Sequence, residues 1–315
     1  MSATLTWLER WFRPIAVVAA SLGLGLALWS QRSAVTAVDW TVHWPGLVGS
    51  VLLFALAAFG GCLAFWFVLH AMTGTSPLGE TVHVWVRSFI ARYVPSGALT
   101  IAVRVRARRS LGATQGQVWS ASAYEQLASA LAGATVAVAA FTLAGRRPPA
   151  AALAILAVGV GLALLFRRRL AARWLSRLRG ESAPGADERR VPVFADATTV
   201  IVATLFDLLG WLVAGGAVWL VVDSILPGQV STPFLVGAYA FSWLLGFVAL
   251  PVPSGFGVRE ATFVALLAPE VGVGAATVLA LAVRLADTLG ELVLFVGAEA
   301  VFRHGPRTHT RAVPS

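Results

Sequence analysis

Nine ionisable side chains interrupt the long apolar segments of this chain. They are Arg87, Arg92, Glu125, Asp207, Arg259, Glu260, Arg284, Asp287 and Glu291. A charged side chain inside such a span costs at least ~2.5 kcal/mol on insertion scales, so these residues mark a pathway or pair with one another. The planar guanidinium of arginine binds phosphate through two parallel hydrogen bonds and stays charged when partly desolvated. The pattern therefore favours a buried site for an anion.

The tetrapeptide Val-Pro-Ser-Gly occurs at residues 94–97 and again at residues 252–255. Proline removes a backbone donor and glycine tolerates a positive φ, so each copy predicts the end of one helix and the start of another. The new helix begins with free amide groups and the positive end of its dipole, which suits a phosphate or carboxylate. A chance repeat, or a kink stabilised by neighbouring helices, is the alternative.

We expect the anion to be bound where the two breaks meet. The predicted binding residues are Arg87, Arg92, Pro95, Ser96, Gly97, Arg104, Ser254, Gly255, Gly257, Arg259 and Arg284. Pairing or coupling roles are predicted for Glu125, Asp207, Glu260, Asp287 and Glu291. We expect Arg92, Arg104, Arg259 and Arg284 to converge on one cavity.

The acidic residues leave several pairings open. Arg284 and Asp287 are three residues apart on one helical face, so they could form a pair within their helix or bind a ligand. Glu125 could pair with Arg87, Arg92 or Arg104. For Asp207 in the middle of its span, a hydrogen-bonded structural role is favoured over proton coupling.

Other chemistry is not indicated. His70 and His83 have no second metal ligand at a suitable spacing, so no metal and no cofactor are expected. Ser96 and Ser254 lack a histidine and aspartate arrangement for nucleophilic attack, which argues against an enzyme. The single cysteine, Cys62, lies in an apolar run and excludes a disulfide framework.

The composition is that of an integral membrane protein. The 315 residues are 58% hydrophobic and 12% charged, against roughly 25% charged in soluble domains. The net charge is +9 and every basic residue is arginine. These arginines lie within or at the ends of apolar spans, where cytoplasmic loops and lipid phosphates explain them better than nucleic acid.

Apolar runs long enough to cross a bilayer are frequent, since about 20 residues suffice. Predicted spans are Pro14–Trp29, Gly46–Met72, Val118–Ala144, Pro149–Phe166, Phe194–Val222, Phe234–Leu250 and Gly272–Phe302. Two shorter apolar pieces, Thr81–Val94 and Val258–Ala268, adjoin the breaks. The arginine-rich segment 167–192 and the arginine-rich tail predict cytoplasmic termini in the plasma (inner) membrane.

This topology predicts one all-α membrane domain, 1–315, with an internal duplication. The repeats are residues 46–144 and 194–302, joined through the cytoplasmic loop 167–192. An odd number of crossings separates them, so they would have inverted topology, each with a broken or re-entrant hairpin at its Pro-Ser-Gly motif. Such bundles bind their substrate near the bilayer midplane.

Two motifs also resemble a known family. Residues 92–97 (Arg-Tyr-Val-Pro-Ser-Gly) resemble its Lys-Tyr-(Leu/Ile)-Pro-Gly region, and residues 253–260 (Pro-Ser-Gly-Phe-Gly-Val-Arg-Glu) resemble its second signature, Pro-Gly-Gly-(Leu/Ile)-Gly-x-Arg-Glu. The later pair Arg284 and Leu285 matches an Arg-Leu of its last span. The family is the flippase-like integral membrane domain shared with lysyl-phosphatidylglycerol synthase. Serine replaces the expected glycine after both prolines, and the soluble aminoacyl-transfer domain is absent from these 315 residues.

The resemblance implies movement of an anionic lipid between leaflets. A polyprenyl phosphate or a polyprenyl-phosphate-linked sugar of the bacterial cell envelope is the favoured cargo. Membrane lipids, and a membrane glycosyltransferase, are the partners it implies. The competing hypotheses are a non-transporting scaffold or regulatory subunit of an envelope glycan assembly complex and, less favoured, an intramembrane lipid-modifying enzyme.

Overall fold

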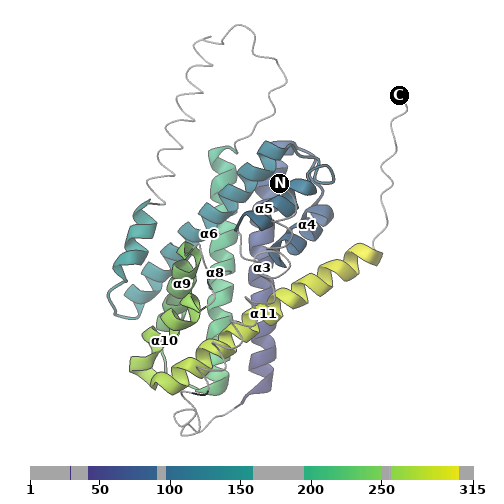
Figure 1. Cartoon of the computed structure of the whole chain (residues 1–315). Coiled ribbons are helices and arrows are strands. Elements are labelled where there is room, and N and C mark those ends of the chain that lie inside the picture. The colour runs from purple at the N-terminus through teal and green to yellow at the C-terminus, as the bar shows by residue number, and fades with distance from the viewer. Residues whose placement is uncertain are drawn as a thin grey trace, which may run out of the picture.

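The computed structural model of the chain describes residues 29, 42–90, 97–158, 195–249, 255 and 257–304. The regular structure in these ranges is helical, and they contain no strand (Figure 1). The helices are α3 (Trp44–Thr73), α4 (Leu78–Ile90), α5 (Gly97–Arg106), α6 (Gln115–Leu143), α8 (Ala197–Ile225), α9 (Thr232–Val248), α10 (Val258–Val271) and α11 (Val273–His304). Residues 150–158 are helical as well. The all-helical class predicted from the sequence is confirmed.

Three of these helices are long and apolar enough to cross a bilayer. They are α3, α6 and the segment Thr198–Ile225 of α8, which confirms a membrane protein. The predicted spans at 46–72, 118–144 and 194–222 differ from these helices by one to three residues at each end. Most of the predicted span Pro14–Trp29 and part of the predicted span Pro149–Phe166 lie outside the described residues.

Local signals explain where the helices begin and end. The Thr114 hydroxyl accepts a hydrogen bond from the Gln117 amide, and Gln117 Oε1 accepts one from the Thr114 amide, so α6 starts at a reciprocal cap. Asp196 accepts from the Thr199 amide at 2.8 Å and caps α8. Hydrogen bonding by the Thr199 side chain, and then by its amide, lowers the pKa of Asp196. Helix α3 ends at Gly74, whose φ of 71° is left-handed.

Helices α3 and α8 lie side by side through the centre of the bundle (Figure 1). Their backbones approach closely at Gly60 and Gly210: a Cβ on Gly60 would lie 3.4 Å from the Gly210 Cα atom, and one on Gly210 would lie 3.1 Å from the Ala57 carbonyl oxygen. A third glycine, Gly290, brings α11 against α3, since its Cβ would lie 2.8 Å from the Val51 carbonyl oxygen. Small residues at helix contacts are how membrane helices maximise van der Waals contact.

The remaining helices surround this pair. Helices α4 and α5 lie toward one end of α3, whereas α10 lies toward the other end (Figure 1). Substantial contacts join α4 to α5, α5 to α6, α6 to α9, α9 to α10 and α10 to α11. Helix α11 also contacts α3, α4 and α8. One buried apolar cluster is built mainly on α6, α8, α9 and α11, and a second on α3 and α4.

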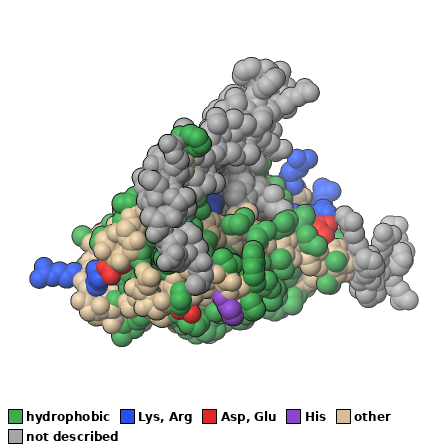
Figure 2. Space-filling view, turned by 90° about the horizontal axis from the view of Figure 1, so that it is seen from below, with side chains coloured by type: hydrophobic (Ala, Val, Ile, Leu, Met, Phe, Trp, Pro, Cys, Tyr) green, Lys and Arg blue, Asp and Glu red, His purple; other side chains and the backbone are tan. Residues whose placement is uncertain are grey.

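The outer surface is apolar, as a lipid-facing surface requires. Large aliphatic side chains that are more than half exposed lie on α3, α8 and α11, and include Leu52, Leu56, Leu205, Leu209, Leu285 and Leu292. Seen from below, hydrophobic side chains cover much of the visible face and basic side chains project near its two ends (Figure 2).

Candidate functional site

A small polar cavity lies among α9, α10 and α11. Its cavity volume is about 20 Å³, room for roughly one water molecule. Its lining consists of Tyr239, Ser242, Arg259, Glu260, Phe263, Ala280, Val283, Arg284 and Asp287. Four of these residues (Arg259, Glu260, Arg284 and Asp287) are charged, and all four were predicted as binding or pairing residues. We call these four the cavity cluster.

Helix α10 begins beside this cavity. The backbone that leads into it has a positive φ at two positions, and both are glycine. Gly257 is its N-cap with a φ of 83°, and the Gly257 amide donates to Glu260 Oε2 at 2.6 Å. Gly255 has a φ of 62°, and a Cβ there would lie 2.5 Å from the Gly246 Cα atom. The chain thus passes α9 at backbone contact distance just before α10 starts. This places Arg259 in the first turn of α10.

The Arg259 side chain is buried between α9 and α11. It is 7% exposed, and its Nη2 atom donates to Asp287 Oδ2 at 3.3 Å and to the Tyr239 hydroxyl at 3.4 Å. Its guanidinium also lies 5.7 Å from the centre of the Tyr239 ring. Gly246 provides the space, because a Cβ at that position would lie 2.3 Å from Arg259 Cγ.

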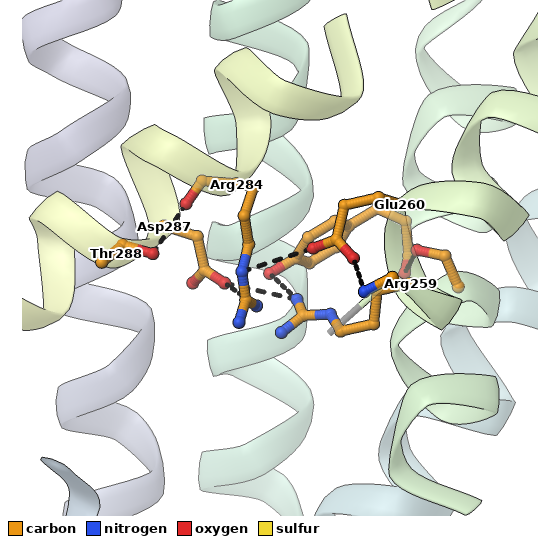
Figure 3. Close-up of polar contacts among 8 residues, drawn as sticks. Arg259, Glu260, Arg284, Asp287 and Thr288 are labelled. Carbon is orange, nitrogen blue, oxygen red and sulfur yellow. Dashed lines mark hydrogen bonds and ion pairs between the residues drawn. The ribbon is translucent and has the colours of Figure 1, made fainter. Parts of the chain in front are cut away.

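Arg284 approaches the same place from α11. Its Nε atom lies 3.4 Å from Glu260 Oε1, and its Nη1 atom lies 3.7 Å from Asp287 Oδ2. Asp287 Oδ2 is therefore shared between Arg259 and Arg284 (Figure 3). The pair within α11 that the spacing of Arg284 and Asp287 predicted is present, but it is part of a group of four charges from two helices.

The cavity cluster is electrically balanced. Arg259 and Arg284 contribute two positive charges and Glu260 and Asp287 two negative ones. The side chains of all four are at most 13% exposed. Two guanidinium groups that face one small cavity can bind a single phosphate or carboxylate, since each offers several donors in a fixed plane.

Arg104 lies in a second buried cluster. It is 1% exposed and donates from Nε to the Ser88 hydroxyl at 2.8 Å, and its Nη1 and Nη2 atoms both donate to Glu125. Trp85 Nε1 donates to the same carboxylate at 2.7 Å. Of the three partners considered for Glu125, the structure thus has Arg104. Because Glu125 holds Arg104 between α4 and α6, Arg104 does not line the cavity, and its expected convergence with Arg259 and Arg284 is not observed.

Arg87 is also placed away from the cavity. It donates from Nε and Nη2 to the two Glu299 oxygens at 2.6 and 2.9 Å, and so joins α4 to the end of α11. His83 Nε2 lies 3.0 Å from the same carboxylate, and its ring stacks on Phe302 at 3.7 Å. The sequence analysis missed this contact because 212 residues separate Arg87 from Glu299.

The other predicted residues fall in different places. Asp207 on α8 is 5% exposed, and its Oδ2 atom has no hydrogen-bond partner among the described residues. The hydrogen-bonded structural role favoured for Asp207 stays a prediction. Glu291 is half-buried on α11, and Gly97 is the first residue of α5. Arg92, Pro95, Ser96 and Ser254 lie outside the described residues. Within the described ranges, no group of three His, Cys, Asp or Glu residues could hold a metal ion.

Two polar lining residues, Tyr239 and Ser242, were not predicted from the sequence. Tyr239 and Ser242 occupy one face of α9, and Gly246 lies one turn further along it. Nothing in the α9 sequence separates these residues from an ordinary apolar span. Their spacing of three and four residues is the only signal, and it becomes meaningful once Arg259 is known to pack against that face.

The fold and the cavity together define a helical membrane protein with a buried, ion-paired arginine site. The sequence pattern of the lysylphosphatidylglycerol synthase TM region matches residues 14–294, which is most of the chain. The chain belongs to this family, as the motifs around Arg92 and Arg259 predicted. Comparison with curated proteins gives no match.

Proposed function

We propose that this protein is a lipid flippase that moves an anionic lipid between the leaflets of the plasma (inner) membrane. A polyprenyl phosphate, or a sugar linked to one, is the favoured cargo. The observation that carries the proposal is the pair of buried arginines, Arg259 and Arg284, facing one cavity in a member of this membrane-domain family. Arginine binds phosphate through two hydrogen bonds and keeps its charge in a partly dry site.

The contacts between helices support an internal duplication. If the halves are structural repeats, the helices correspond in pairs: α3 to α8, α4 to α9, α5 to α10 and α6 to α11. Each contact between two helices should then have a counterpart between the two corresponding helices. The contact of α6 with α9 then becomes that of α11 with α4, and the contact of α3 with α11 becomes that of α8 with α6. Every other substantial contact between these helices likewise has its counterpart or is its own counterpart. This is the pattern expected of two structural repeats related by a twofold axis.

The short helices support the re-entrant hairpins of the proposal. Helices α4, α5 and α10 contain 13, 10 and 14 residues. At 1.5 Å per residue they rise roughly 20, 15 and 21 Å, less than the ~30 Å of the hydrocarbon core. Helices α4 and α5 contact each other, as do α9 and α10. In the proposed architecture the two hairpins enter from opposite faces, with both chain termini in the cytoplasm.

In the proposed mechanism, the headgroup passes through the polar cavity while the lipid tail stays in the membrane beside the bundle. A phosphate in hydrocarbon would lose many kcal/mol of hydration, whereas the tail keeps ~0.8 kcal/mol for each buried CH₂ by staying in lipid. The two repeats would rock against each other, so that the cavity opens to one leaflet at a time. In this mechanism the protein moves the lipid and makes or breaks no covalent bond.

Reconstituted vesicles test the proposal. Purified protein should equilibrate a fluorescent polyprenyl phosphate between leaflets faster than protein-free vesicles do, and Arg259→Ala should remove most of that acceleration. Phosphatidylglycerol, tested in parallel, distinguishes the cargo. If the folded protein accelerates neither lipid, the flippase proposal is wrong.

A scaffold or regulatory subunit of an envelope glycan assembly complex is the second candidate. The balanced charges of the cavity cluster favour it, because such a group can be stable without a ligand. A membrane glycosyltransferase is then the proposed partner. Co-purification of such an enzyme, together with the failure of both lipids to cross, would favour this reading.

A further inference from the structure

The protein contains two arginine–carboxylate clusters of the same construction. Arg104 lies on α5, the helix after the first Pro-Ser-Gly motif, and bridges Ser88 on α4 to Glu125 on α6. Arg259 lies on α10, the helix after the second motif, and bridges Tyr239 on α9 to Asp287 on α11. In both, an arginine near a Pro-Ser-Gly motif joins the preceding helix to the following long helix. The arginine–carboxylate distances of the second cluster can therefore be compared with those of the first.

The two clusters differ in the nitrogen–oxygen distances between their arginines and carboxylates. Hydrogen bonds between an arginine and a carboxylate are normally about 2.7–2.9 Å long. Arg104 donates a short hydrogen bond from Nη1 and a second one of 3.3 Å from Nη2 to Glu125, and Arg87 donates to Glu299 at 2.6 and 2.9 Å. The ion pairs of the cavity cluster measure 3.3, 3.4 and 3.7 Å. Among the ion pairs of the described residues, the long ones are those beside the cavity.

We propose that the Asp287 carboxylate is an internal anion that competes with the lipid phosphate for Arg259 and Arg284. This inference rests on the proposed function and adds the event that regulates its site. Phosphate binding displaces Asp287 from both arginines, and return of Asp287 displaces the phosphate. Binding and release are thus two directions of one exchange.

Charge balance and geometry both support this exchange. With Glu260 and Asp287 in place, the cluster has no net charge, so it attracts an incoming anion only when a carboxylate moves away. Asp287 Oδ2 lies close to both guanidinium groups. One phosphate oxygen in its position would contact both arginines, and the other oxygens would add hydrogen bonds that a carboxylate cannot make. Glu260 is the less mobile of the two acids, because the Gly257 amide also holds it at 2.6 Å.

The exchange predicts that removing the charge of Asp287 tightens anion binding. The full chain in phosphatidylcholine nanodiscs is titrated calorimetrically with farnesyl phosphate and, separately, with dihexanoyl phosphatidylglycerol. Asp287→Asn should bind at least one of these probes ten or more times as tightly as the wild type. Asp223→Asn makes the same chemical change at the end of α8, outside the cavity, and should bind as the wild type does.

Asp287→Glu is the second variant, in case Asp287→Asn does not fold. It keeps the charge, and its longer side chain closes the distances to the arginines, so it should weaken binding at least threefold. If either variant folds and binds both probes with wild-type affinity while Arg259→Ala loses binding, the exchange is refuted and the flippase proposal survives. If Arg259→Ala also binds as the wild type does, the site itself is wrong and both proposals fall.

Discussion

Gly246 and Arg259 share a space that has no room for a methyl group. A Cβ on Gly246 would lie 2.3 Å from Arg259 Cγ and 3.3 Å from the Gly255 Cα atom. The position of the arginine therefore depends on a glycine of the preceding helix, α9. A change at Gly246 acts on the cavity cluster without altering any charge.

The first prediction follows from this contact. Gly246→Ala should lower the affinity for farnesyl phosphate at least tenfold, because the Arg259 side chain must move out of the cavity. Calorimetric titration measures the effect. Gly216→Ala is the matched control, since its new methyl group meets only Leu53 Cδ1 at an ordinary 3.8 Å. Equal affinities of the two variants would show that Arg259 adapts to the lost space.

The second prediction concerns the chemistry of Arg259. Arg259→Lys should already slow lipid transfer, because an ammonium group cannot make the paired hydrogen bonds of a guanidinium. Arg259→Ala should nearly abolish transfer while the protein still inserts into the membrane. The flip rate in vesicles is measured after insertion and folding have been verified by size-exclusion chromatography. A lysine variant as fast as the wild type would exclude a bidentate contact.

The third prediction assigns a structural role to Arg104. Arg104→Ala leaves the buried Glu125 carboxylate without its main partner, which should cost about 3–5 kcal/mol of folding free energy. Replacing both residues by apolar ones, Arg104→Met with Glu125→Leu, should cost much less, since neither charge is then stranded. Unfolding in mild detergent compares the variants. A double variant as unstable as Arg104→Ala would contradict this explanation.

The fourth prediction concerns the contact between α3 and α11. Gly290→Ala would place a methyl group 2.6 Å from Phe54 Cβ and 2.8 Å from the Val51 carbonyl oxygen. Overpacking of this kind costs about 1–3 kcal/mol. Gly297→Ala, two turns further along α11, meets nothing within 4 Å and should be neutral or stabilising by up to about 1 kcal/mol. Thermal unfolding of the two variants in one detergent measures the difference.

The fifth prediction tests the topology. In a Cys62→Ser background, a cysteine at Ser110 should react with an impermeant reagent from the cytoplasm, and one at Gln229 from outside. Wild-type Cys62 is 0% exposed. The wild-type protein should therefore react poorly with the reagent, and it is the negative control. Two further segments extend the test: we expect Arg173–Gly185 to face the cytoplasm and Val35–Thr41 to face outside. Labelling of residues 110 and 229 from the same side would refute the inverted repeats.

The sequence predicts the helices well and their partners poorly. Apolar length is enough to locate α3, α6 and α8 within a few residues, because a bilayer demands about 20 apolar residues whatever the fold. The partner of Glu125 was left open among Arg87, Arg92 and Arg104, since spacing along a chain does not fix contacts between helices. The Arg87–Glu299 ion pair was missed for the same reason.

Within the cavity, the sequence predicts the charged residues but not their arrangement. The Gly-x-Arg-Glu motif indicates Arg259 and Glu260, and the spacing of three indicates Arg284 with Asp287. That Asp287 lies between two arginines depends on how α10 packs on α11. That packing depends on the left-handed turn at Gly257, whose exact angle no local pattern specifies.

The glycine contacts of α3 with α8 and α11 also imply that the centre of the bundle is locally more stable than its short helices. Between lipid-embedded helices no hydrophobic force resists separation, so close van der Waals contact at Gly60, Gly210 and Gly290 is what holds this centre. Amide hydrogens along α3 and α8 should exchange with solvent only when the whole bundle opens. Those of the 10-residue α5 and the 14-residue α10 should exchange earlier, through local opening.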